Sequence, residues 1–267
     1  MSSDTPNTPL DPGTITDLAK ATKEVIPQTI SQTDGALSAL VGWFNNVILY
    51  PVKKANITFR YKLENFEADL REKMASIPPD KICEPNLMIA GPTLEALRYC
   101  YDEEKLRNMY INLLASSVNS DRVKNAHPSF VEVIRQMDPL DAQLFEMLAK
   151  RSEKYHRAIN ANVGLSGQRR NFLNAMPEWF WGWGVPNYDM FQNSASLIRL
   201  RRLGLVELMF DRTAGEADYK DLKQADALRS ILQHYQSRNP NLELEITAIE
   251  SIFYINEFGR FFAEICL

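Results

Sequence analysis

Apolar residues recur every three or four positions through most of this 267-residue chain, which is the spacing of one face of an α-helix. The clearest stretch is 53–76, whose other faces carry Lys, Arg, Glu and Asp. The apolar positions of this stretch, with the one that follows it, are Phe59, Leu63, Phe66, Leu70, Met74 and Ile77. Pro78 ends the pattern, because the residue before a proline is disfavoured in the helical conformation. We predict a long amphipathic helix that packs against a partner helix or its copy in another subunit.

Shorter patterns of the same kind predict further helices, several of them with recognisable ends. Their expected ranges are 103–118, 128–137, 139–152, from near Asp189 to Leu203, and 257–266. Asp138 can cap the helix that begins at Pro139, and Asp141 adds negative charge to its first turn. Gly204 suits the left-handed cap that ends a helix. Another helix is expected to begin near Pro92, because proline fits the first helical turn.

Two stretches in the last third of the chain predict strands. Residues 205–210 and 242–255 are rich in Leu, Ile, Phe and Tyr, and the second alternates loosely between apolar and polar positions. Residues 211–240 form an insert between them that holds a helix around 220–236. Residues 160–187 contain four Gly and two Pro, so they predict the longest loop of the chain.

The order of these elements predicts a mainly α-helical protein with two domains after a flexible tail at 1–13. The first domain, 14–138, is expected to be a helical hairpin or bundle. The second, 139–267, is expected to be α+β with inserts at 160–187 and 211–240. Its run of helix, Leu203-Gly204-Leu205-Val206-Glu207, returning strand and final helix resembles the end of a winged helix-turn-helix domain.

The winged-helix resemblance implies that the helix before Gly204 is the recognition helix. Arg199, Arg201 and Arg202 would then project from one end of it and suit phosphates, base edges or a protein partner. The chain carries a net charge of −4, so a site for nucleic acid would have to be local. Winged helices also serve as dimerisation and protein-docking modules, and both interpretations stay open.

Composition and motifs narrow the kinds of chemical site that the protein is expected to contain. The 45% apolar and 24% charged residues suit a globular protein. The three cysteines are far apart and form no C-x-x-C pair, which favours a reducing cytosol over a disulfide framework. The three histidines have no metal-ligand spacing, and neither a nucleophile elbow nor a phosphate-binding glycine loop is present. We expect no enzyme activity, no metal and no cofactor.

Residues 36–52 are the most apolar stretch near the start. They number 17 and include two adjacent Asn, whereas a spanning helix needs about 20 apolar residues. A helical hairpin or bundle is the simpler interpretation of this stretch. The alternative is a helix lying on the membrane surface, with Trp43 and Tyr50 at headgroup depth.

The run Trp179-Phe180-Trp181-Gly182-Trp183 is the most unusual local feature. We favour the interpretation that Trp179, Trp181 and Trp183 cover the core from outside. The alternative is an exposed anchor for a partner or a membrane surface, because tryptophan is enriched in binding hot spots. Stacking on nucleic acid is a third, weaker interpretation.

Three blocks in the middle of the chain carry a family resemblance. The blocks are Glu84-Pro85 followed by IAGPTLEALRY at 89–99, LRNMYINLLASS at 106–117, and HPSFVEVIRQMDP at 127–139. They resemble the abortive-infection alpha family, a bacterial family associated with phage defence. The likeness covers residues 50–150 well and the last 70 loosely, whereas the Trp-rich run and 211–240 are not matched. It supplies no catalytic residues.

This resemblance implies a non-enzymatic phage-defence protein that acts by binding a protein partner. A DNA-binding regulator that uses Arg199, Arg201 and Arg202 is one alternative, and a membrane-active effector that uses residues 29–52 is another. Assembly into a homo-oligomer is a further possibility that the sequence leaves open. The expected location is the cytoplasm, with peripheral contact at the inner face of the membrane under the membrane alternative.

Overall fold

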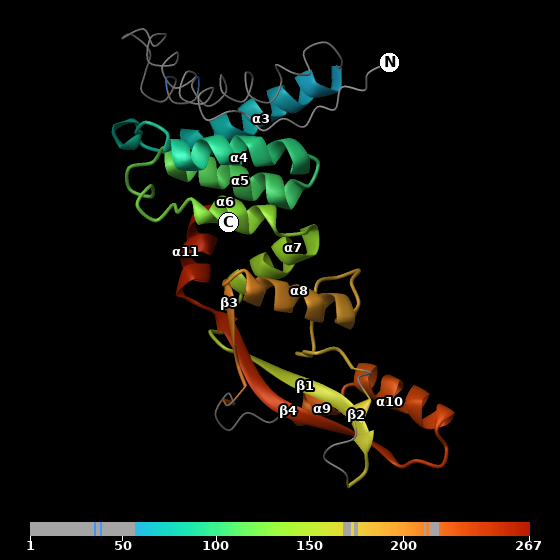
Figure 1. The fold of residues 1–267 in the computed structure, drawn as a ribbon. Helices are drawn as coiled ribbons and strands as arrows, with labels where there is room; N and C mark the ends of the chain where they lie inside the picture. Colours follow the sequence, from blue (N-terminus) through green and yellow to red (C-terminus); the bar gives the residue numbers. More distant parts are fainter. Residues whose placement is uncertain are drawn as a thin grey trace, which may run out of the picture. The chain divides into compact units, whose positions relative to one another are not determined.

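The structure is a computed structural model that describes residues 35, 38, 57–167, 172–173, 176–210, 212–213 and 219–267. The chain divides into two compact units between Arg135 and Gln136, and Cys266 groups with the first (Figure 1). The predicted tail at 1–13, Trp43, Tyr50 and most of the apolar stretch 36–52 lie outside the described residues. Within the described residues, no helix combines the length and apolarity needed to cross a bilayer.

The first unit is built from helices. They are α3 (Ile57–Ala75), α4 (Leu87–Cys100), α5 (Glu104–Ser117) and α6 (Ser129–Arg135), with a short 3-10 turn, η3 (Pro79–Lys81), after α3. Helix α5 packs against the other three helices. The predicted long helix is confirmed as α3, in which Phe66, Leu70 and Met74 are fully buried.

Helix α4 begins earlier than the sequence predicts. Asn86 caps it by accepting a hydrogen bond from the Met88 backbone, and Pro92 lies inside the helix instead of in its first turn. The apolar residues that the extra turn adds explain the difference, because Ile89 and Ala90 are buried on the face that carries Leu94.

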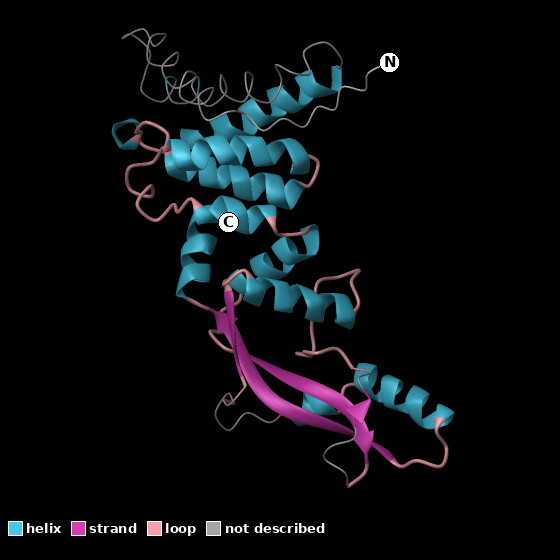
Figure 2. Ribbon diagram, in the orientation of Figure 1, coloured by secondary structure: helices cyan, strands magenta, loops and turns pink. Residues whose placement is uncertain are grey.

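The second unit combines five helices with one sheet among its described residues. The helices are α7 (Pro139–Ala149), α8 (Met190–Arg202), α9 (Lys220–Lys223), α10 (Asp226–Arg238) and α11 (Glu257–Cys266). The strands are β1 (His156–Leu165), β2 (Phe172–Leu173), β3 (Val206–Met209) and β4 (Leu244–Ile255). All strand pairs are antiparallel, in the order β2-β1-β4-β3, and Figure 2 shows the long strands β1 and β4 side by side. A mainly helical protein with a small sheet is therefore confirmed.

Strand β1 corrects the prediction of a loop over 160–187. It pairs with β4 from His156 to Leu165, and its residues Ile159, Ala161 and Val163 enter a core with side chains from the α9 and α10 region. The strand was not predicted because it contains Asn160, Asn162 and Gly164, and Asn and Gly are depleted in strands. The two predicted strands, 205–210 and 242–255, are confirmed as β3 and β4.

Candidate functional site

Helix α8 lies where the sequence predicts it and has clear ends. The Asp189 carboxylate accepts a hydrogen bond from the Gln192 backbone at 2.8 Å, and the Gln192 side chain accepts one from the Asp189 backbone at 3.0 Å. This reciprocal cap satisfies two amide groups of the first turn. Gly204, with a φ of 78°, follows the helix in the left-handed conformation that glycine adopts most easily.

The inner face of α8 is unusually polar, since Asn193, Ser194 and Ser196 are all buried there. The Asn193 amide accepts a hydrogen bond from the Val185 backbone and donates to the carbonyls of Tyr188 and Asp189. The Ser194 hydroxyl accepts one from the Trp179 backbone at 2.9 Å. These bonds fasten the Trp-rich segment to α8.

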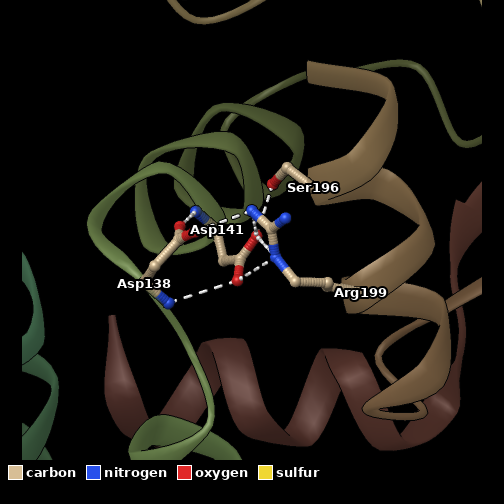
Figure 3. A network of polar contacts seen from close by, with 4 residues as sticks. All are labelled: Asp138, Asp141, Ser196 and Arg199. Atoms are coloured by element: carbon tan, nitrogen blue, oxygen red, sulfur yellow. Dashed lines mark hydrogen bonds and ion pairs between the residues drawn. The ribbon is translucent and has the colours of Figure 1, made fainter. Parts of the chain in front are cut away.

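A second set of polar contacts joins α8 to α7, and Figure 3 shows its side chains converging on the carboxylate of Asp141. Asp141 is fully buried and accepts hydrogen bonds from the Ser196 hydroxyl at 2.6 Å and from Arg199 Nε at 2.9 Å. Arg199 Nη2 also reaches Asp138 Oδ2 at 2.8 Å. Asp138 and Asp141 form the predicted cap of α7, so one carboxylate serves both a helix end and an ion pair.

This network changes the prediction for Arg199. The sequence suggests that its guanidinium projects with Arg201 and Arg202, but it lies against Asp138 and Asp141. The hydrogen bond to Asp141 raises the pKa of Arg199 above its ordinary value. Arg199 therefore holds α7 and α8 together, and the exposed cations of this helix are Arg201 and Arg202.

The opposite side of α8 carries an apolar stripe that ends in the exposed arginines. Phe191, Ala195, Ile198 and Arg202 follow one another at intervals of 4, 3 and 4, which places them on one side of a helix. The Phe191 side chain is 46% exposed, Ala195 and Arg202 are exposed, and Ile198 is half-buried. We call these four residues, with Arg201 beside them, the α8 outer face.

Arg201 is held in place by an aromatic neighbour. Its guanidinium carbon lies 5.2 Å from the centroid of the Phe210 ring, which is itself exposed. The Phe210 ring in turn packs edge-on against Trp179, with 5.1 Å between centroids. A cation over an aromatic ring is attracted by the ring quadrupole, so this contact favours a position of Arg201 at the end of the α8 outer face.

The Trp-rich segment covers the core, as the sequence interpretation favours. Trp179 and Trp181 are 1% and 5% exposed, so the alternative of an exposed anchor is wrong for both. Trp181 packs edge-on against Phe253 and Trp183, and the backbone of Phe180 pairs in both directions with Ile159 of β1. Trp183 is half-buried, and the guanidinium carbon of Arg151 lies 3.8 Å from its ring centroid.

Comparison with known proteins assigns the chain to a family. The abortive infection alpha family matches it over residues 58–266. The chain belongs to that family. The match extends past the three blocks at 84–99, 106–117 and 127–139, and its range includes the Trp-rich segment and residues 211–240. Neither a curated relative nor a solved structure matches the chain.

In this abortive infection alpha protein, the three histidines lie on separate elements. The His127 ring accepts a hydrogen bond from the Ser129 backbone, where α6 begins, and Phe130 beside it is buried. His156 is buried between Trp183 and Phe253, and burial, followed by the charge of Arg151, lowers its pKa. His234 lies against Tyr235 on α10.

The three cysteines of this abortive infection alpha protein are free thiols. Burial raises the pKa of Cys83 and of Cys266, and it raises the pKa of Cys100 to about 11. The thiolate is the reactive form of cysteine, so a raised pKa lowers the fraction of each cysteine that is in this form at neutral pH.

Phe191 and Ile198 were not predicted from the sequence as candidate site residues. Their signal was a second periodic set, 191, 195 and 198, on the same helix that carries the arginine cluster. One apolar stripe is enough to bury a helix, so a second stripe on the opposite face indicates a surface that contacts something else.

Proposed function

We propose that the protein is a non-enzymatic phage-defence protein of the abortive-infection type, and that it acts by docking a protein partner on the α8 outer face. Membership of the abortive infection alpha family supports the defence role. The docking role rests on one observation, an apolar stripe in which Phe191 and Ala195 are exposed and Ile198 is half-buried, and which ends in two exposed arginines. Aromatic residues and arginine are enriched among the residues that dominate protein interfaces.

A second candidate function is DNA binding, because α8 followed by β3 and β4 occurs in the order of a winged helix. A recognition helix reads base edges in the major groove mainly with its N-terminal residues. In α8 that half carries Phe191 and Ala195, and the arginines lie in the last turn. Arg199 is also committed to Asp141, which leaves two cations for phosphates. The distribution of charge therefore favours a protein partner.

The non-enzymatic part of the proposal is supported by how the reactive groups are used. Ser196 and Asp141 are the kind of pair that could activate a hydroxyl. The Ser196 hydroxyl, however, donates to a carboxylate that also accepts hydrogen bonds from Arg199 and from the backbone amide of Asp138. Both Ser196 and Asp141 are fully buried, so a substrate would have to displace packed helices to reach them.

A plaque assay with full-length protein in a phage-infected bacterial host tests the proposal. Phe191→Asp should abolish most of the protection, because a charge in the middle of an apolar contact loses the contact and must be desolvated. Phe261→Asp is the matched control, since Phe261 lies on α11 with 41% exposure. Both variants should keep the thermal midpoint of the wild-type protein.

Equal protection by Phe191→Asp and wild-type protein would contradict docking on this face. Salt-sensitive binding of duplex DNA by wild-type protein, lost in a double Arg201→Ala, Arg202→Ala variant, would instead favour the DNA alternative.

A further inference from the structure

We infer that the α8 outer face receives an amphipathic segment of its partner, with apolar anchors followed by acidic side chains. The inference rests on the proposed function and adds the chemical class of the partner. It is carried by the order of the side chains along one exposed helix face, from Phe191 at the first turn to Arg201 and Arg202 at the last.

The apolar half of the face determines how the apolar residues of the partner must be spaced. Phe191 and Ile198 are seven residues apart, two turns of helix, with Ala195 between them. The small Ala195 side chain lets an approaching apolar side chain come close to the α8 backbone between its larger neighbours. A partner segment that places apolar residues at helical intervals of three and four matches this spacing.

The charged half of the face determines which sign of charge the partner must carry. Helix α8 contains no acidic residue, and its three arginines are Arg199, Arg201 and Arg202. Asp138 and Asp141 pair with Arg199 from the α7 side, which leaves Arg201 and Arg202 as the exposed cations at the end of α8. In a chain of net charge −4, this is a local cationic end beside an apolar stripe, and it complements acidic side chains.

Arginine also suits this role geometrically. Its planar guanidinium donates two parallel hydrogen bonds to one carboxylate, which fixes direction as well as charge. The attraction between Arg201 and the Phe210 ring favours rotamers that keep the guanidinium over the ring. Less conformational entropy is then lost when a carboxylate binds.

Photo-crosslinking identifies the segment directly. A photoreactive amino acid replaces Ala195 in the full-length chain, and the cells are irradiated after phage infection. The same replacement at Gln233, an exposed position of α10, is the control. The expected adduct is specific to position 195 and lies in a protein segment with apolar residues at helical intervals and acidic residues within about two turns of the crosslink.

A synthetic peptide of the crosslinked segment then tests the charge. Arg202→Glu should weaken its binding by about tenfold or more, which corresponds to about 1.4 kcal/mol. Arg238→Glu makes the same charge change in the last turn of α10 and should leave binding unaltered. A peptide whose acidic residues are replaced by Lys should bind the Arg202→Glu variant better than the wild type.

Three results would overturn the inference. They are a crosslinked segment without acidic residues, an adduct to DNA or to a second copy of this chain, and equal effects of Arg202→Glu and Arg238→Glu. Each leaves the plaque assay with Phe191→Asp as a separate measure of whether the α8 outer face is needed for defence.

Discussion

Helices α5 and α8 differ by one residue in length but are held in place in opposite ways. Helix α5 buries nine of its 14 residues, most of them apolar, against three neighbouring helices. Helix α8 has 13 residues and buries five, of which Asn193, Ser194 and Ser196 are polar. Apolar burial is non-directional and needs area, whereas a few hydrogen bonds fix a helix through directional contacts.

The comparison explains why one helix can be a scaffold and the other a binding surface. The buried residues of α5 extend over most of its circumference, so little of this helix is free to contact a partner. Helix α8 is fastened on one side by Asp141 and the Trp-rich segment, which leaves Phe191 and Ala195 exposed on the other. The polar contacts thus hold α8 by its inner face and leave most of its apolar stripe outside the core.

Removing the Asp141 carboxylate should produce the largest loss of stability. Asp141→Ala leaves the Arg199 guanidinium and the Ser196 hydroxyl without their acceptor, and breaking a buried ion pair from one side costs about 4 kcal/mol. Urea unfolding followed by tryptophan fluorescence measures the effect, since three of the four tryptophans lie in the second unit. Asp138→Ala is the control, because its half-exposed carboxylate is a cap worth about 1 kcal/mol. Equal losses in the two variants would show that burial of Asp141 adds nothing.

Truncating an apolar side chain of α5 should rank second. Leu113 is fully buried, and Leu113→Ala removes its transfer energy and leaves a cavity, at a cost of about 3 kcal/mol. The loss should appear in the far-ultraviolet circular dichroism of unfolding more than in tryptophan fluorescence. Asn108→Ala on the exposed side of α5 should be nearly neutral. A smaller loss for Leu113→Ala than for Asn108→Ala would refute the apolar anchoring of α5.

Cutting the link between α8 and the Trp-rich segment should cost less. Asn193→Ala removes three hydrogen bonds and leaves the buried Val185 amide without its acceptor, a loss of about 2 kcal/mol. Gly184→Ala should disturb the same contact from the other side, because a Cβ at Gly184 would lie 2.7 Å from the Asn193 amide. Near-ultraviolet circular dichroism should change in both variants. An unaltered aromatic signal would mean that Asn193 does not order the tryptophans.

The difference between apolar and polar anchoring also explains which elements could be predicted from the sequence and which could not. Helices α3 and α5 were predictable because their apolar positions repeat with the helical period, and α7 because Asp138 and Pro139 mark its start. Ion pairs between α7 and α8 were not predictable, since Ser196 and Arg199 lie 55 and 58 residues from Asp141. No local pattern encodes such a distant partner.

Strand β1 and the candidate site were missed for related reasons. Strand β1 gains its stability from pairing with β4 about 90 residues away in sequence. Its apolar residues alternate with Asn160 and Asn162, but Asn is depleted in strands, so the alternation did not indicate a strand. At the candidate site, the arginines were visible as a cluster, but their division between Arg199 and the exposed pair depends on where α7 packs.

Acid should weaken the second unit by a smaller amount, through His156. Burial lowers the pKa of this histidine, so the folded protein binds its proton less readily than the unfolded chain, whose histidine pKa is about 6.5. The contribution of His156 to stability is therefore fully present above about pH 6.5, and it decreases as the pH falls from there toward the lower pKa of the folded state. Urea midpoints from tryptophan fluorescence at a series of pH values measure the slope.

Two substitutions sharpen this last test. His156→Phe keeps an aromatic ring between Trp183 and Phe253 and should reduce the pH dependence of the urea midpoint. His234→Gln removes an exposed histidine of α10 and should leave that dependence as in the wild type. If His156→Phe and the wild type lost stability equally on acidification, the titrating group would lie elsewhere, and the aromatic packing around His156 would not be what makes the second unit sensitive to acid.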